Sequence, residues 1–143
     1  MKSSTSESSC IGTDVIAGFP GETNDLFKES YDYIQKSLLD YLHVFPYSDR
    51  RGTKASIRED KVSEDLKKSR SKALRELGES KKIDFYSKFI GKRLAAISEK
   101  NYHARTRNYI DVNMMKKEFV EPGKMMDLII DRIEDGKAYG RYI

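Results

Sequence analysis

The feature that most constrains the fold is a pair of apolar runs, each ending in a polar loop that contains glycine. The first is DVIAGFPGET at 14–23, and the second is HVFPYSDRRGTKA at 43–55. Nearly continuous apolar runs are typical of strands covered on both faces in a parallel sheet. One helix fits between them, so the sequence predicts a βαβ unit. Because two strands and one helix close no barrel, we expect the edge of a larger α/β domain and interpret the chain as a fragment.

The interval between the two runs has the pattern of an amphipathic helix. Thr23 or Asn24 can cap its start. Its apolar residues recur at helical spacing, at Phe27, Tyr31, Ile34 and Leu38. From Leu39 the period changes to two, as in a strand, with one face formed by Tyr41, His43, Phe45 and Tyr47. We expect His43 to be a hydrogen-bonded residue of the core or lumen.

The positive charge of the chain is concentrated in one segment. Residues 61–93 carry 11 Lys/Arg and 5 Asp/Glu, whereas the whole chain has a net charge of +4. Such a segment suggests a polyanionic partner, most simply RNA, although charge alone favours the alternative of a solvated helix surface. The pattern predicts a helix over 62–90 that connects two domains, with a break near Gly78. Its expected buried stripe is Leu66, Ala73, Leu74 and Leu77.

After Gly91 the pattern changes to short strands separated by turn signals such as Glu121-Pro122-Gly123 and Glu134-Asp135-Gly136. The expected strands are 94–97, 109–112, 125–133 and 138–143. Four or five short antiparallel strands indicate a small closed barrel of the oligonucleotide-binding kind. The expected organisation is therefore α/β followed by all-β: a disordered serine-rich start (1–9), an α/β part (10–60), a basic helical connector (61–91) and a barrel (92–143).

Two loops in the first half are candidate binding sites. The first leads into a helix N-terminus and offers Gly18, Gly21 and Glu22 to an anionic or polar ligand group, unless it is only a tight turn. The second, over 47–53, offers a phenol, hydroxyls and two guanidiniums, which suit phosphates and bases. Its candidates are Tyr47, Ser48, Arg50 and Arg51, although the arginines could instead pair with acidic neighbours.

The best candidate in the second half is the run 105–109. Arginines neutralise phosphates, amides read base edges and a tyrosine ring stacks on an unpaired base. The residues are Arg105, Thr106, Arg107, Asn108 and Tyr109, and Lys92, Arg93, Lys137, Tyr139 and Arg141 could extend the surface. Because alternate residues of a strand point inward, Tyr109 or its neighbours could belong to the barrel core instead.

Catalytic and metal sites are not indicated. The single cysteine, Cys10, cannot by itself anchor an iron–sulfur or zinc site, and we expect a buried structural thiol. His103 is expected in a surface loop. No run approaches the roughly 20 apolar residues of a membrane span, and the start lacks the apolar segment of a signal peptide. A cytoplasmic location without membrane contact is therefore expected.

Four ordered motifs resemble those of the radical S-adenosylmethionine methylthiotransferases. They are DVIAGFPGET, then LHVFPYS-x-R-x-GT-x-A, then a basic helix ending at 89–92, then T-x-NYI-x-V at 106–112. The LHVFPYS form is most similar to the branch that methylthiolates N6-threonylcarbamoyladenosine at position 37 of tRNA. The resemblance implies the last βαβ unit of a partial radical (β/α) barrel, a connector, and a small TRAM barrel that binds tRNA.

The resemblance also implies what the whole enzyme uses. Such proteins hold two [4Fe–4S] clusters and S-adenosylmethionine, and this chain has neither the CxxxCxxC loop nor the other cluster cysteines. The resemblance places Gly18, Gly21 and Glu22 near S-adenosylmethionine. It also places 47–53 near the target nucleotide, and the connector with 106–109 on the anticodon arm of tRNA. Two departures are Arg51 in place of proline and Ala104 in place of glycine.

Three hypotheses follow from this sequence. The chain is a truncated tRNA methylthiotransferase and inactive alone, and the sequence leaves open whether a separate polypeptide supplies the missing N-terminal half. Alternatively it is a stand-alone RNA-binding module without catalysis. A third possibility is a non-functional gene remnant, because the open edge of its βαβ unit exposes strand hydrogen-bonding groups and apolar surface.

Overall fold

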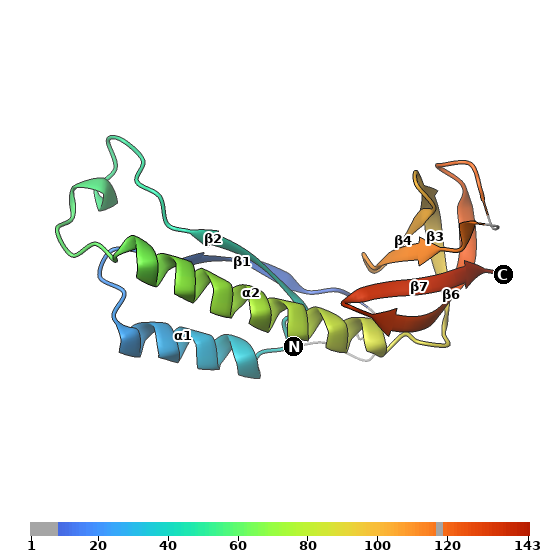
Figure 1. The fold of residues 1–143 in the computed structure, drawn as a ribbon, viewed down its shortest axis with the longest axis horizontal. Helices are drawn as coiled ribbons and strands as arrows, with labels where there is room; N and C mark the ends of the chain where they lie inside the picture. Colours follow the sequence, from blue (N-terminus) through green and yellow to red (C-terminus); the bar gives the residue numbers. More distant parts are fainter. Residues whose placement is uncertain (1–8, 117–118) are drawn as a thin grey trace. The chain divides into compact units, whose positions relative to one another are not determined.

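The computed structural model describes residues 9–116 and 119–143, so nearly all of the expected serine-rich start lies outside the described residues. The described residues form two compact units (Figure 1). The first unit is Ile11–Ser80, and the second is Lys81–Ile143 together with Ser9 and Cys10.

The first unit contains the predicted βαβ arrangement. Strands β1 (Gly12–Ala17) and β2 (Tyr41–Pro46) pair in parallel, from Gly12 opposite Tyr41 to Ala17 opposite Pro46. Helix α1 (Asn24–Lys36) connects them, and the Thr23 hydroxyl caps it by accepting the Leu26 N–H at 3.1 Å. The βαβ prediction and the Thr23 cap are confirmed.

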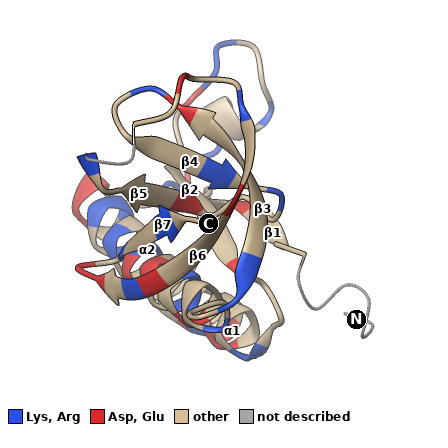
Figure 2. Ribbon diagram, turned by 90° about the vertical axis from the view of Figure 1, so that its right-hand side faces the viewer, with Lys and Arg blue, Asp and Glu red and all other residues tan. Residues whose placement is uncertain are grey.

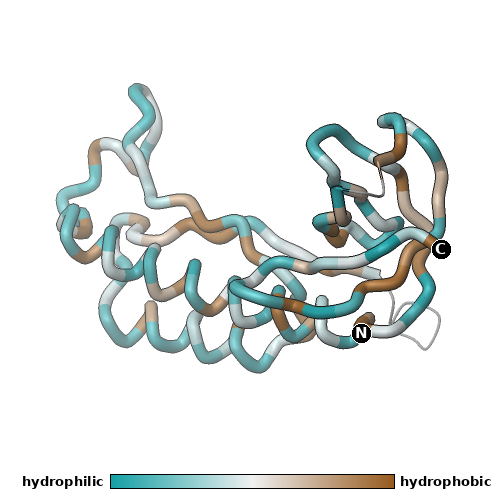
Figure 3. Tube along the Cα trace, turned by 45° about the vertical axis from the view of Figure 1, so that its right-hand side comes forward, coloured by the Kyte–Doolittle hydropathy of each residue, from teal (hydrophilic) through white to brown (hydrophobic). Residues whose placement is uncertain are grey.

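Only one face of this two-stranded sheet is covered. Val15, Leu42 and Val44 pack with Ala17 against a small core completed by Ile34, Leu74 and Leu77. On the opposite face the side chains of Ile16 and Phe45 are 55% and 51% exposed. The prediction of strands covered on both faces is therefore wrong for the described residues, because the helices pack on one side. Figure 3 shows the apolar stretch along these two strands.

Two further expectations about the first unit are also wrong. His43 is exposed, because it shares the uncovered face of β2 with Phe45. Leu38 lies beyond the end of α1, which Ser37 terminates by donating its backbone N–H to the Ile34 carbonyl at 3.1 Å, and its side chain is exposed.

Helix α2 (Glu64–Ser87) follows a loop that contains a short 3-10 helix, η1 (Ala55–Ile57). The predicted helix is confirmed, but it continues through Gly78 without the expected break. A Cβ atom at Gly78 would lie 3.2 Å from Leu42 Cβ, so this glycine permits close packing of α2 on the sheet. Leu66, expected in the buried stripe, is exposed instead.

The second unit is a closed five-stranded barrel in the order β3-β4-β5-β7-β6, and β6 pairs with β3 to close it. The strands are β3 (Arg93–Glu99), β4 (His103–Thr106), β5 (Asp111–Met114), β6 (Met125–Glu134) and β7 (Lys137–Tyr142). The small closed barrel is confirmed. Two details differ from expectation: β5 and β7 pair in parallel, and β4 lies where a loop was expected.

The barrel has its own core, which the last turns of α2 complete. Phe85 and Phe89 are buried there together with residues of all five strands and of the turn before β5. The buried members from the barrel are Ala96, Ala104, Ile110, Val112, Met114, Leu128, Ile130 and Ala138. Ala104 is fully buried, so the methyl group at this position is part of the core. Within 9–116 and 119–143, no helix combines the length and the hydropathy needed to cross a bilayer.

Candidate functional site

The loop between β1 and α1 is organised by its own polar groups. Gly18 and Gly21 have φ angles of 81° and 89°, which favour glycine. The Gly18 N–H donates to Glu22 Oε1 at 2.9 Å, and the Gly21 N–H donates to the Asp60 carbonyl at 2.8 Å. Both glycine amides that were expected to meet a ligand are therefore used within the unit.

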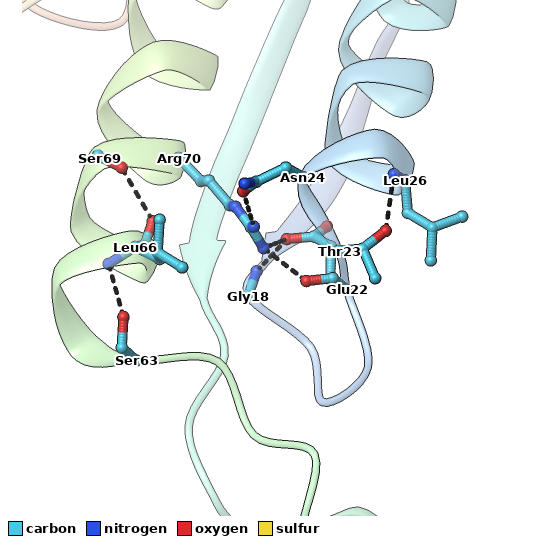
Figure 4. A network of polar contacts seen from close by, with 9 residues as sticks. All are labelled: Gly18, Glu22, Thr23, Asn24, Leu26, Ser63, Leu66, Ser69 and Arg70. Carbon is cyan, nitrogen blue, oxygen red and sulfur yellow. Dashed lines mark hydrogen bonds and ion pairs between the residues drawn. The ribbon is translucent and has the colours of Figure 1, made fainter.

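Arg70 of α2 holds this loop, and sequence reasoning missed it. Its side chain is only 4% exposed, and it donates to Glu22 Oε1 at 2.9 Å, the Glu22 carbonyl at 2.8 Å and Asn24 Oδ1 at 2.7 Å (Figure 4). A usable signal existed, because Arg70 lies four and seven residues before Leu74 and Leu77 and so shares their helix face. Glu22 is thus bound by Arg70, whereas Thr23 caps the helix.

The second loop brings together three of its four predicted residues. Tyr47, Ser48 and Arg50 line an open groove of about 640 Å³, whose apolar wall includes Phe19 and Phe45. The Phe19 and Tyr47 rings meet edge to face with centroids 5.3 Å apart.

The arginines of the second loop point to solvent. Arg51 does not line the groove, and both Arg50 and Arg51 are exposed. Among the described residues, neither arginine forms an ion pair with a carboxylate, so the alternative of acidic neighbours finds no support there.

The start of this loop is electrostatically coupled to Lys61, which lies between the loop and α2. Lys61 Nζ donates to Asp49 Oδ2 at 2.6 Å, and this hydrogen bond lowers the pKa of the Asp49 carboxyl. Desolvation, followed by the Asp49 carboxylate, raises the pKa of the Tyr47 phenol. Lys67 lies 5.4 Å from the centre of the Tyr47 ring, a cation–π distance.

In the barrel, the run 105–109 spans the end of β4 and the tight turn that leads to β5. The Thr106 N–H donates to the Ile110 carbonyl at 3.0 Å. The buried Thr106 hydroxyl donates to Asn108 Oδ1 at 2.5 Å and accepts the Ile110 N–H at 2.9 Å. These bonds hold Tyr109 in the left-handed region, at φ 68°, with its side chain 68% exposed. Tyr109 therefore lies on the surface, and the alternative of a core residue is wrong for it. The alternative is confirmed for its neighbours, because Ile110 is fully buried and Thr106, a predicted RNA-binding residue, is 4% exposed.

The basic residues of this unit differ in how they are engaged. Arg105 Nε donates to Glu99 Oε1 at 3.0 Å, and this bond raises the pKa of Arg105. Arg93 pairs with Asp127 at 2.6 Å, and Lys92 lies 5.7 Å from the centre of the Phe89 ring. Figure 2 shows basic and acidic residues interspersed on the ribbon. The turn brings Arg105, Thr106, Arg107 and Tyr109 onto one open groove, which Lys92 and Arg93 do not line.

Three other sequence expectations have structural outcomes. His103 lies on β4, not in a loop, and its Nδ1 is 3.0 Å from Asp111 Oδ1. Cys10 is half-buried against the barrel core. Over the part of the chain that the structure describes, no cluster of three His, Cys, Asp or Glu side chains could hold a metal ion.

The sequence was compared with known proteins. It is 42% identical over 122 residues to the threonylcarbamoyladenosine tRNA methylthiotransferase of Aquifex aeolicus, covering 85% of this chain and 29% of that protein. The protein of the same name from Rickettsia prowazekii is 38% identical, over 88% of this chain and 29% of its own length. A tRNA-2-methylthio-N(6)-dimethylallyladenosine synthase of Acetivibrio thermocellus is 31% identical, again over 29% of its length.

These matches cover most of this chain but only a small part of each relative. The chain spans less than a third of the length of the curated relatives named above, while those relatives align with most of this chain. No protein-family model matches the sequence.

Proposed function

Since this chain belongs to the methylthiotransferase family and corresponds to its C-terminal part, we propose that it is the tRNA-binding part of a tRNA-modifying methylthiotransferase. The second unit is the TRAM barrel in this proposal, and it holds the anticodon arm. The first unit is the last βαβ element of the radical S-adenosylmethionine barrel, and the modified nucleoside is threonylcarbamoyladenosine.

The observation that carries the proposal is the turn 106–110 at the surface of the barrel. A non-glycine residue with positive φ is costly and persists only where its surroundings impose it. Here the Thr106 hydroxyl and two backbone hydrogen bonds impose it on Tyr109 and leave the ring in solvent. An exposed, pre-organised aromatic ring beside Arg107 is the combination that single-stranded RNA recognition uses.

The residues of this chain do not fit the iron–sulfur clusters of the family. A cluster needs several thiolates, and the sequence contains one cysteine. S-adenosylmethionine near Gly18, Gly21 and Glu22 stays a prediction, since the two glycine amides and Glu22 Oε1 already have partners. In the proposed function this part of the enzyme therefore supplies positioning and RNA contacts. The radical chemistry comes from the cluster-carrying part, here called the companion, whether or not it lies on the same polypeptide.

Binding of tRNA by the full chain tests the proposal. We expect the logarithm of the association constant to fall linearly with the logarithm of salt concentration, with a slope of about −0.7 to −0.9 per phosphate neutralised. Tyr109→Asn keeps a residue tolerant of positive φ but removes the ring, so we expect weaker binding with an intact barrel. Tyr33→Asn is the matched control, because Tyr33 is also exposed but lies on α1. Binding that neither salt nor Tyr109→Asn weakens would contradict the proposal.

A second candidate function is a stand-alone RNA-binding module that has no companion. It predicts the same tRNA affinity, but no complex with a polypeptide carrying the cluster cysteines. The uncovered face of β1 and β2, with Ile16 and Phe45 exposed, favours the companion. Co-purification of the chain with the N-terminal part of a relative, followed by assay of tRNA methylthiolation, separates the two candidates. Digestion of the first unit as fast as an unfolded chain would favour the gene remnant instead.

A further inference from the structure

An apolar patch lies on the outer face of the barrel beside the turn 106–110. In the strand register Ile97 of β3 is opposite Met125 of β6 on one side and Arg105 of β4 on the other. Residues directly opposite one another point to the same side of a sheet. Ile97, Met125 and Tyr109 are all exposed and line one open groove of about 520 Å³. We call these three residues the apolar patch.

Among the residues that the structure describes, one arginine of the barrel forms no ion pair, and it lies at the edge of this patch. Four of the five pair with carboxylates, namely Arg93 with Asp127, Arg105 with Glu99, Arg132 with Glu134 and Arg141 with Asp131. Arg107 is exposed, lines the groove and forms no ion pair with any residue that the structure describes. Its backbone N–H donates to the Ala95 carbonyl at 3.1 Å, which fixes it next to β3.

We infer that the apolar patch binds one unpaired nucleobase of the RNA, and that Arg107 contacts an adjoining phosphate. The inference rests on the proposed function and names the site within it. The two flat faces of a nucleobase are apolar. One face can pack against the side chains of Ile97 and Met125, and Tyr109 supplies an aromatic ring on which a base can stack. In a duplex both faces of a base are covered by its neighbours, so the ligand is a single-stranded segment.

The unpaired charge of Arg107 argues for RNA over a protein partner. A guanidinium with no counterion beside an apolar surface is complementary to a phosphate next to a base. The same pairing occurs at every nucleotide of a single strand, so the site tolerates different sequences. Arg105, in contrast, is neutralised by Glu99 and forms the polar border of the groove.

The test uses the full chain and a short single-stranded oligoribonucleotide that carries one 2-aminopurine, whose fluorescence is quenched by stacking. We expect quenching on binding, and an affinity at least about fivefold lower for Met125→Ser and for Ile97→Ser. Met115→Ser is the matched control, since Met115 is also an exposed methionine of this unit but does not line the groove. The same RNA annealed to its complement should bind more weakly than the single strand.

A second pair of variants tests the phosphate contact. Arg107→Ala should lower affinity and make the salt slope shallower by about one phosphate, whereas Arg141→Ala, which removes an ion-paired arginine, should change the slope less. If wild type binds the single strand but Met125→Ser and Ile97→Ser bind and quench like Met115→Ser, the inference is overturned and the proposed function stands. If wild type binds no RNA, both are overturned, and a protein partner becomes the occupant to seek.

Discussion

The closed barrel and the β1–β2 sheet differ in how the edges of their strands are paired. Every strand of the barrel has a neighbour on both edges, and its buried side chains come from all five strands. In the described part of the first unit, β1 and β2 pair only with each other. A two-stranded sheet has little stability by itself, so the first unit depends on the helices that cover one of its faces.

This difference indicates which interactions stabilise each unit. The barrel is held by a continuous apolar core, and its hydrogen-bonding edges are closed. The first unit has a smaller core, formed by Ala17, Ile34, Leu74 and Leu77, together with one buried polar contact from Arg70 to the loop 18–24. We therefore expect its stability to depend strongly on a charged residue, and that of the barrel to depend on apolar contacts.

The largest expected loss of stability is that of the first unit on substitution of Arg70→Leu, and it tests this comparison directly. The substitution leaves the mostly buried Glu22 carboxylate without its cation, and removing one partner of a buried pair costs about 3–5 kcal/mol. We expect hydrogen exchange of β1 and α1 to accelerate while the barrel amides stay protected. Arg93→Leu is the control, because its ion pair with Asp127 is exposed and should contribute under about 1 kcal/mol. Equal losses for the two variants would contradict the assignment of Arg70.

Leu128→Ala is the corresponding test of the barrel. Leu128 is fully buried in β6, and truncation of a buried leucine costs about 2–5 kcal/mol through lost burial and the cavity left behind. The matched variant in the open sheet is Ile16→Ala, on the uncovered face, where we expect a loss below about 1 kcal/mol. Denaturant unfolding measures both. A loss for Ile16→Ala as large as for Leu128→Ala would show that the open face is covered in solution.

Much of the fold was predictable, because it follows local patterns. The two periods of apolar residues, the Thr23 cap and the turns near Gly123 and Gly136 placed α1, β1, β2 and most of the barrel. Strand β4 was not predicted, since its sequence His-Ala-Arg-Thr has only four residues, three of them polar, too few to show a period of two. The parallel pairing of β5 with β7 depends on closure of the barrel, which no local pattern specifies.

The candidate site was predictable only in part. The exposed position of Tyr109 and the shared groove of Arg105 and Arg107 agree with the residue types that were chosen. Arg70 and Lys67 were grouped with the basic residues of the connector, yet both are buried in the first unit. The helix face that Arg70 shares with Leu74 and Leu77 indicated that it is buried, but its contacts across 48 residues to Glu22 leave no mark on local periodicity.

A smaller effect is expected from making the open face polar. The double variant Ile16→Ser and Phe45→Thr removes the two large apolar side chains of that face while keeping the pattern of the covered face intact. Exposed apolar strands favour association between chains. We therefore expect the double variant to bind less of a hydrophobic fluorescent dye than wild type, and to self-associate less at high protein concentration. Loss of binding to a companion polypeptide should accompany it. Unchanged self-association would show that the open face is not the surface through which the chains associate.

The smallest expected effect concerns Asp60, at the border of the loop that precedes α2. Its hydrogen bonds from Arg58 lower the pKa of the Asp60 carboxyl below its ordinary value near 4. A carboxyl with a lower pKa when folded stabilises the protein above its unfolded pKa, and this contribution is lost as the pH falls through the folded pKa. Asp60→Asn should therefore lower the melting temperature slightly at pH 7, and the two proteins should converge once the pH falls below the lowered pKa of the folded Asp60 carboxyl. Because both side chains are about half exposed, added salt should also reduce the difference. A difference that persists in acid would assign the effect to packing of the side chain and not to its charge.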